Sequence, residues 1–294
     1  MKKERISLIA GFMPPVCMAV LMGFEYLVES GRITGGLWPA ALAEIVAFML
    51  PFLLLALLRR LGGEEKLPFR FKSPAPSSLA FALFLSAAIP IGVFLVNCLL
   101  GFAMGQGVGA QQGRLALQSY TTAEGALPSL LVVIVLPAVV EELFFRSALL
   151  GCMDSAGTCT AVLFSACSFA LVHGSASNFV GPLLAGMAFG YLCYALGSVW
   201  PAVCGHLISN LYTWGFAYFS NVYEAFGLWG YVILVNIVCF CVLLYLAMRS
   251  LEKLIERGKI PRFKKGGLEK LIFSFLSPGF LLLVLLFVLK SFYL

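Results

Sequence analysis

Long apolar runs are the feature that most constrains how this chain can fold. A helix needs about 20 apolar residues to cross the hydrocarbon core of a bilayer, and its backbone polar groups must be paired within the segment. Charged residues make up only 12% of the 294 residues, against roughly a quarter in soluble domains. The sequence therefore predicts an all-α polytopic membrane bundle of eight or nine transmembrane helices, forming one integral membrane domain over residues 1–294. The nine apolar stretches are 6–28, 38–58, 78–100, 127–150, 160–178, 181–197, 201–219, 228–248 and 272–289.

The lysines and arginines are distributed unevenly between the two sides that nine spans would define. Sixteen of the 20 lie in the segments 1–5, 59–77 and 249–271, and three lie in loops on the opposite side. Because cytoplasmic loops carry the excess of positive charge, we expect a multi-pass protein of the cell membrane with a cytoplasmic N-terminus. The net charge of +6 is then explained by topology and by contact with lipid headgroups, so nucleic acid need not be a partner.

Two polar segments each allow two interpretations. The Gly- and Gln-rich segment 104–125 is typical of a connecting loop, and the sharper alternative is a re-entrant or gating segment. The basic segment 249–271 is typical of charge that sets topology, and the alternative is a lipid-regulatory role. The sequence favours the first interpretation in both cases.

Three charges lie inside one predicted span, in the stretch VVEELFFRSALL at 139–150. An ionisable group at the centre of a membrane helix costs on the order of 3 kcal/mol, so it faces protein or water and is a functional candidate. Glu142 and Arg146 are one helical turn apart, where they can form an ion pair. Glu141 is rotated off that line and lacks a basic partner on its own helix. A carboxyl group without such a partner is suited to proton transfer.

The chain contains only two histidines, and both lie in predicted spans. His173 follows Phe169 by one turn, and Asn210 follows His206 by one turn, so each pair shares a helix face. A single histidine or asparagine in a span is often only an interhelical hydrogen-bonding residue. Because both histidines accompany the Glu-Glu pair, we expect the three faces to converge on one pocket.

Three other polar or reactive residues have no such motif around them. Glu25 and Glu44 are intramembrane acids that we interpret as packing or hydration sites, and Cys204 is not expected to be a catalytic thiol.

The expected depths of these residues predict a pocket that opens toward the cytoplasm. Glu141 and Asn210 lie about 13 Å from the predicted cytoplasmic ends of their helices, and His206 lies about 7 Å from its helix end. His173 lies about 20 Å from the start of its predicted span. This mismatch requires that the span of His173 starts later than position 160 or is tilted.

Three blocks in this region resemble a known family. They are LPAVVEELFFRSALLG, AVLFSACSFALVHGS and FGYLCYALGSVWPAVCGHLISN, which contain the pattern EExxxR, FxxxH and HxxxN in order. This pattern resembles the CPBP (Abi, CAAX protease-like) family of intramembrane endopeptidases, which is related to the type II CAAX prenyl proteases. The resemblance covers roughly residues 130–215, within an expected protease core at about 127–219. One departure is Ser147, where the family commonly has glycine.

The resemblance implies a role for each residue of the pattern. Glu141 and His173 would activate water, and His206 and Asn210 would stabilise the tetrahedral oxyanion. The supporting residues would be Glu142 and Arg146, which hold the helix in place, and Phe169, which forms a wall of the pocket.

The resemblance leaves metal dependence open. Glu141, His173 and His206 could form a zinc site with an open water position, and family members are often described as metalloproteases. These residues come from three helices without a short motif such as HExxH, and we favour a mechanism without a metal cofactor.

The sequence thus favours an intramembrane endopeptidase that acts on a peptide or membrane-protein substrate near the cytoplasmic leaflet. Its partners would be that substrate and the lipid bilayer, and the sequence indicates no particular oligomeric state. One alternative is a non-catalytic membrane scaffold or regulator of the same fold. The other is a proton-coupled transporter, for which buried Glu and His residues are also expected, although no inverted repeat is visible.

Overall fold

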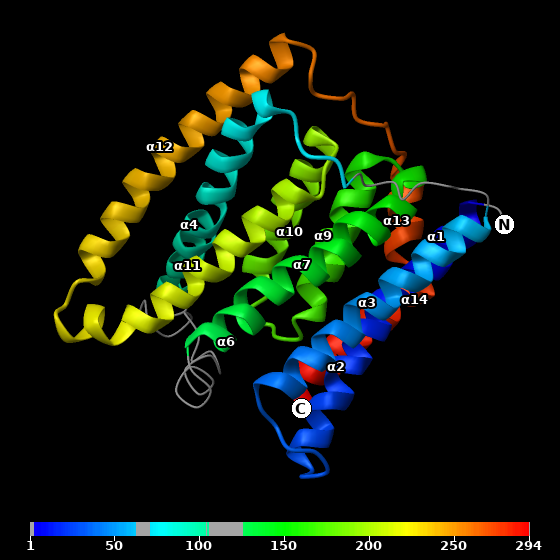
Figure 1. The fold of residues 1–294 in the computed structure, drawn as a ribbon, viewed down its shortest axis with the longest axis horizontal. Coiled ribbons are helices and arrows are strands. Elements are labelled where there is room, and N and C mark those ends of the chain that lie inside the picture. Colours follow the sequence, from blue (N-terminus) through cyan, green and yellow to red (C-terminus); the bar gives the residue numbers. More distant parts are fainter. Residues whose placement is uncertain (1–2, 63–70, 104, 106–125, 294) are drawn as a thin grey trace.

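The computed structural model describes residues 3–62, 71–103, 105 and 126–293 of the chain. Every regular element in these ranges is helical, and they contain no β-strand (Figure 1). This confirms the predicted all-α fold class. The segment 104–125, for which we considered a connecting and a gating role, lies outside the described residues except for Gly105.

The elements follow one another in this order: α1 (Lys3–Gly11), α2 (Met13–Glu29), α3 (Leu37–Leu61), η1 (Pro76–Ser78), α4 (Leu79–Ala103), α6 (Ala126–Leu130), η2 (Leu131–Val135), α7 (Leu136–Glu142), η3 (Leu143–Leu149), α8 (Leu150–Cys152), η4 (Asp154–Ala156), α9 (Thr158–Val172), α10 (Val180–Leu196), α11 (Trp200–Ala225), α12 (Trp229–Glu256), α13 (Leu268–Phe275) and α14 (Pro278–Tyr293).

Fewer helices have the length and hydropathy of a membrane span than the sequence predicted. Within the described residues five helices qualify, and the pair α13 and α14, bent by 51°, adds a sixth if it counts as one span. Helices α9 and α10 have only 15 and 17 residues, so α9 is about 22 Å long and shorter than the hydrocarbon core. Helix α11 has 26 residues but is less apolar, because it carries His206, Ser209 and Asn210. The predicted count of eight or nine spans is therefore not confirmed. The five are Ile6–Glu29, Leu37–Leu61, Pro76–Ala103, Leu127–Cys152 and Trp229–Glu256.

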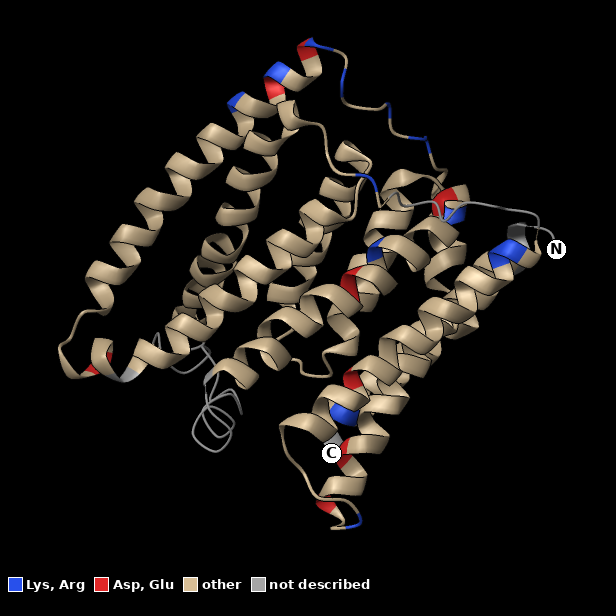
Figure 2. Cartoon of the chain, viewed as in Figure 1, with Lys and Arg blue, Asp and Glu red and all other residues tan. Residues whose placement is uncertain are grey.

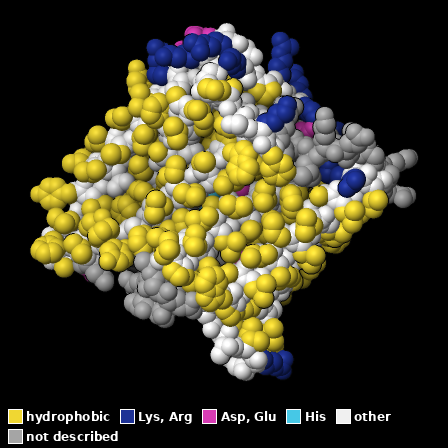
Figure 3. Space-filling model, viewed as in Figure 1, with side chains coloured by type: hydrophobic (Ala, Val, Ile, Leu, Met, Phe, Trp, Pro, Cys, Tyr) yellow, Lys and Arg dark blue, Asp and Glu magenta, His cyan; other side chains and the backbone are white. Residues whose placement is uncertain are grey.

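The helices form an inner group with an outer helix pair on one side and three helices on the other. Helices α9 and α10 pack against each other, and α11 packs against α10 and α7. Helices α2, α3 and α14 lie together on one side, and α4 and α12 lie together on the other (Figure 1). Most apolar side chains of α12 are exposed, and apolar side chains cover most of the face drawn in Figure 3. A helix that exposes apolar side chains in this way suits contact with lipid.

Loops that hold most of the basic residues meet at one end of the bundle, which we call the basic end (Figure 2). Ser198 Oγ donates a hydrogen bond to the Lys72 carbonyl at 2.7 Å, and Lys259 Nζ donates to Ser77 Oγ at 2.9 Å. Arg59 Nη1 donates to the Gly151 carbonyl at 3.1 Å. These contacts place segments from four loops at one end, as expected for alternating spans. That this end faces the cytoplasm stays a prediction.

The segment that joins α12 to α13 crosses the basic end as an extended strap, residues 258–267. The Lys264 backbone N–H donates to Thr158 Oγ1 at 2.9 Å, and the Lys264 ammonium pairs with Asp154. The strap therefore fastens the outer helix α12 to the start of α9.

The helix that carries the Glu-Glu pair contains two π-helical segments, η2 and η3. Pro137 lies in the first turn of α7, directly after η2. Proline has no backbone N–H, so it cannot continue the regular pattern of α-helical hydrogen bonds, and wider turns of this kind are often found at functional sites. The helix is thus long enough to span the membrane, and a π-helical segment lies on each side of Glu141 and Glu142.

Candidate active site

Arg146 is the largest fully buried side chain in the described part of the protein. Its Nε lies 3.1 Å from Glu142 Oε2, and its Nη1 donates a hydrogen bond to Ser165 Oγ at 3.0 Å. The guanidinium carbon lies 4.8 Å from the ring centroid of Phe169, in a cation–π contact. The expected pair of Glu142 and Arg146 is therefore present, and α9 surrounds it with a hydroxyl and an aromatic face.

Glu142 has a second partner, His206 on α11. Its Oε1 lies 3.1 Å from His206 Nδ1, and both side chains are buried. Because an ionised carboxylate only accepts hydrogen bonds, Nδ1 of this imidazole donates and Nε2 is directed elsewhere. The His206 ring stacks on Phe189 at 5.6 Å between ring centroids. Sequence spacing predicted the ion pair with Arg146, but no spacing rule could predict this contact between distant helices.

His173 lies at the end of α9 and not inside a longer span, which corrects the predicted span 160–178. Helix α9 ends at Val172, and Gly174, with φ of 65°, lets the chain turn away. His173 Nδ1 lies 2.8 Å from the Phe169 carbonyl oxygen. A carbonyl only accepts, so Nδ1 carries the proton and Nε2 keeps a free lone pair. Helix α9 starts at Thr158, so a start later than position 160 does not explain the depth of His173. His173 follows the last residue of α9, at the end that faces away from the basic end.

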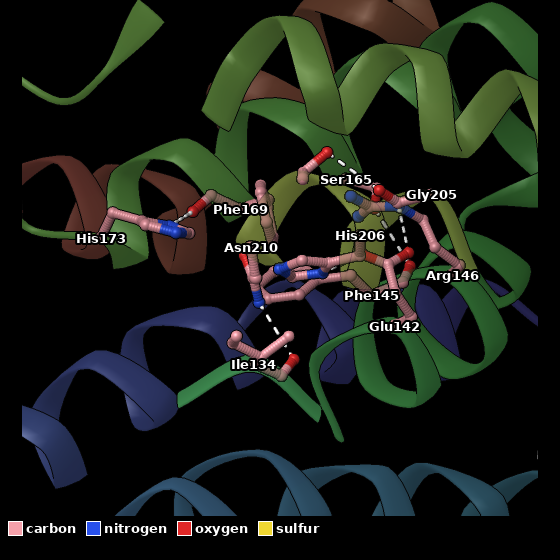
Figure 4. A network of polar contacts seen from close by, with 11 residues as sticks. Ile134, Glu142, Phe145, Arg146, Ser165, Phe169, His173, Gly205, His206 and Asn210 are labelled. Carbon is pink, nitrogen blue, oxygen red and sulfur yellow. Dashed lines mark hydrogen bonds and ion pairs between the residues drawn. The ribbon is translucent and has the colours of Figure 1, made fainter. Parts of the chain in front are cut away.

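The Phe169 ring contacts both imidazoles. Its centroid lies 4.7 Å from that of His173 and 5.7 Å from that of His206. The side chain is 2% exposed and also packs edge-on against Phe145. Figure 4 shows Phe169 together with both histidines and the ion pair. Phe169 is thus a shared wall of this cluster, and it separates the two histidines in this structure.

Asn210 lies one turn beyond His206 on α11. Its Nδ2 donates to the Ile134 carbonyl oxygen at 3.3 Å, and Ile134 belongs to the π-helical segment η2 (Figure 4). A primary amide has two N–H groups, so this contact leaves one for another acceptor. The side chain of Asn210 is held on the same side of the bundle as His206.

A cavity of about 330 Å³ lies beside this cluster. Glu141 and His173 both line it, whereas His206 and Asn210 are not among its lining residues. The other polar lining residues are Glu25, Glu44 and Lys290, and the apolar lining residues are Leu21, Phe24, Ala40, Ala43, Phe48, Phe145 and Val172. The structure thus brings the two residues expected to activate water to one cavity, and the two expected oxyanion donors do not line it.

The cavity lies toward the end of the bundle that carries the α2–α3 turn. Its residues Glu25 and Lys290 come from the last turns of α2 and α14 and form an ion pair at 2.7 Å. Figure 1 shows this end opposite the strap and the N-terminus. The cavity therefore does not open at the basic end, so its position does not support the predicted opening toward the cytoplasm if the basic end is cytoplasmic.

Glu44 is the site residue that sequence reasoning missed. We interpreted it as a packing or hydration site, but its carboxyl group is in hydrogen-bond contact with that of Glu141. The only sequence signal was its position as an acid inside an apolar helix. Cys204 is exposed and has no part in this cluster.

The arrangement does not fit the zinc site that we considered. No group of three or more His, Cys, Asp and Glu side chains in the described ranges could hold a metal ion. For the candidate set of Glu141, His173 and His206, the Phe169 ring stands between the two imidazoles. We therefore derive no chemical step through a metal.

Comparison with protein families identifies the part of the chain that contains this cluster. Residues 123–212 match the model of the family described as type II CAAX prenyl endopeptidase Rce1-like. We call this matched segment, residues 123–212, the Rce1-like domain. This match confirms the family resemblance that the three sequence blocks indicated, and the described part of the Rce1-like domain runs from α6 into α11. No curated protein and no solved structure is significantly similar to the chain.

All seven residues of the motif lie within the Rce1-like domain. Glu44, Glu25 and Lys290 lie outside it, on α3, α2 and α14. The cavity is thus built partly by the Rce1-like domain and partly by helices that the family model does not cover.

Proposed function

We propose that this multi-pass membrane protein is an intramembrane endopeptidase that hydrolyses a peptide or membrane-protein substrate. The observation that carries the proposal is that Glu141 and His173 of the Rce1-like domain line one cavity inside a helical membrane bundle. A carboxylate and an imidazole with a free Nε2 can together orient a water molecule and remove its proton.

The proposed reaction starts with water in the cavity. Glu141 accepts the water proton while His173 Nε2 accepts a hydrogen bond from the same water. The hydroxide forms a bond to the carbonyl carbon of the scissile peptide, which gives a tetrahedral oxyanion. The proton then passes from Glu141 to the peptide nitrogen, the C–N bond breaks, and an acid and an amine leave.

The oxyanion needs donors that are fixed before the reaction. The free N–H of Asn210 and the Nε2–H of a protonated His206 can supply them, and Glu142 balances the positive charge of that imidazolium. Because the Phe169 ring stands between His173 and His206, we expect this ring to rotate when substrate binds.

The leaflet of cleavage depends on which end of the bundle is cytoplasmic. We expected both a cytoplasmic N-terminus and cleavage near the cytoplasmic leaflet. The cavity lies away from the basic end, so these two expectations cannot both hold for a substrate that enters through this cavity. A cytoplasmic N-terminus implies entry from the other leaflet.

The test compares substrates in cells that carry Glu141→Ala, His206→Ala or the unchanged protein. Glu141→Ala removes the base that accepts the water proton, and His206→Ala removes one oxyanion donor, which typically slows such a reaction on the order of 100-fold or more. Membrane proteins that are substrates should therefore accumulate uncleaved in both variants. The control is Glu252→Ala, which removes an exposed acid paired with Arg249 on α12 and should leave cleavage unchanged.

If Glu141→Ala and His206→Ala both remain folded in the membrane and keep full biological activity, the proposal is wrong. That outcome would favour the non-catalytic scaffold.

Proton uptake by the purified protein in vesicles, lost in Glu141→Ala, would favour the transporter instead. Elemental analysis of purified protein tests the metal alternative, and stoichiometric zinc would overturn our preference for a metal-free mechanism.

A further inference from the structure

We propose that Glu44 of α3 is a positioning residue for Glu141 and holds its carboxylate toward the cavity. This inference rests on the proposed peptidase function and extends it to a residue outside the Rce1-like domain. Glu44 lines the same cavity as Glu141 and His173.

The packing of α3 against the Rce1-like domain sets this contact. Phe48 lies one turn after Glu44 on α3, and its ring packs on Phe144 and Phe145 at 6.0 and 5.7 Å between centroids. Phe145 in turn lies one turn after Glu141. Glu44 with Glu141 and Phe48 with Phe145 are therefore successive contacts between two helices that run in the same direction here. The buried phenylalanines maintain the register that brings the two carboxyl groups together.

The buried oxygens of the two acids lack other donors. Glu44 Oε1 and Glu141 Oε2 are each fully buried, and neither receives a hydrogen bond from an N–H or O–H group of the described residues. The two carboxyl groups are in hydrogen-bond contact with each other. Two carboxyl groups can form such a bond only if one of them carries a proton, and a buried polar group without a partner is costly. The contact is satisfied when one of the two carboxyl groups is protonated and donates its O–H to the other.

The neighbouring carboxylate is differently engaged. Glu142 is occupied by Arg146 and His206, so the partner that remains for Glu141 is the carboxyl group of Glu44. This leaves the second oxygen of Glu141 for water, with the rotation of the carboxylate held by Glu44. Misplacement of a reacting group by about 1 Å can reduce the rate about 100-fold, which is why such a contact matters to the reaction.

The experiment compares Glu44→Ala and Glu44→Gln in the purified full-length protein. The probe is a fluorogenic peptide that spans the cleavage site of a membrane protein that accumulates in the Glu141→Ala strain. Glu44→Ala should lower kcat about 100-fold with KM changed by less than about threefold, because substrate binding is intact. Glu44→Gln should keep kcat within about tenfold of the wild type, because its amide group can still donate to or accept from the Glu141 carboxyl group. The matched control is Glu252→Gln, which should change neither constant.

An infrared measurement tests the contact without any substrate. The wild type should show the carbonyl stretch of a protonated carboxylic acid, and Glu44→Gln and Glu141→Gln should each lose or shift it, whereas Glu252→Gln should not. If this band responds as expected but no peptide is cleaved, the contact stands and the peptidase function fails.

Three results would overturn the positioning role. One is a folded Glu44→Ala protein with wild-type kcat. Another is a Glu44→Gln protein as inactive as Glu44→Ala, which would assign proton transfer to Glu44. The third is a carbonyl band that neither Glu44→Gln nor Glu141→Gln changes. If Glu44→Ala does not fold, Glu44→Gln and the infrared band still decide the question.

Discussion

At the scale of residues, a buried ion pair and an imidazole form the centre of the Rce1-like domain. Arg146 and Glu142 are fully buried, and a buried charge is tolerated only with good partners. Glu142 uses one oxygen for Arg146 and the other for His206. Glu142 therefore links two helices: it pairs with Arg146 one turn further along its own helix, and it accepts a hydrogen bond from His206 on α11.

We predict that Arg146→Ala destabilises the protein by about 3–5 kcal/mol, because it leaves the Glu142 carboxylate buried without a cation. Arg146→Lys should restore little of this loss, since an ammonium cannot reproduce the planar contacts with Ser165 and Phe169. Denaturant unfolding in detergent micelles measures both changes. Arg249→Ala breaks an exposed pair with Glu252 and should cost less than about 1 kcal/mol. Equal effects of Arg146→Ala and Arg249→Ala would contradict the prediction.

At the scale of elements, close packing of α9 on α10 holds Phe169 in place. A Cβ at Gly186 of α10 would lie 3.1 Å from the Ala166 Cα and 3.4 Å from Phe169 Cδ1. Small residues at such positions let two membrane helices approach closely. The distance between α9 and α10 therefore sets where the Phe169 ring stands between the histidines.

We predict that Gly186→Leu destabilises the protein by about 1–3 kcal/mol, because the added side chain forces the two helices apart. Displacement of Phe169 should lower kcat in the same variant. The control is Gly215→Leu on α11, since a Cβ there meets nothing within 4 Å. Thermal unfolding and peptide cleavage provide the two measurements. Similar behaviour of Gly186→Leu and Gly215→Leu would show that this contact does not constrain the site.

At the scale of the whole molecule, the basic end and the cavity lie at opposite ends of the bundle. The basic end is fastened by the strap, and the far end carries the Glu25–Lys290 pair beside the cavity. The positive-inside rule applies to the basic end. By this rule we expect the basic end to be cytoplasmic and the cavity to face the opposite leaflet.

We predict that Glu25→Cys reacts with a membrane-impermeant thiol reagent added outside intact cells, while Lys259→Cys on the strap reacts only after the membrane is opened. Both variants need a background in which the exposed cysteines are replaced by serine; these are Cys159, Cys204, Cys239 and Cys241. The expected pattern follows from a cytoplasmic basic end. The reverse pattern would overturn the cytoplasmic N-terminus and would restore the expectation of a cytoplasmic cavity mouth.

Local spacing was sufficient for some of these features and insufficient for others. The contact between Glu142 and Arg146 depends on one helical turn, so it was visible in the sequence. The end of α9 before His173 was not predicted, because the turn after it is short and the apolar run resumes at Phe179. The predicted count of eight or nine spans is not confirmed, for a similar reason. Helices α9 and α10 have only 15 and 17 residues, and their hydropathy also reflects burial against other helices.

The sequence by itself determined that the chain is a helical membrane protein and which residues its family motif contains. Hydropathy and helical periodicity record these properties, because each depends on residues close in the chain. Only the tertiary structure decided that Glu142 meets His206, that Phe169 separates the histidines, and that Glu44 meets Glu141. These contacts join helices that are far apart in sequence. An apolar pattern shows that a helix is shielded from water, but it does not specify which helix shields it.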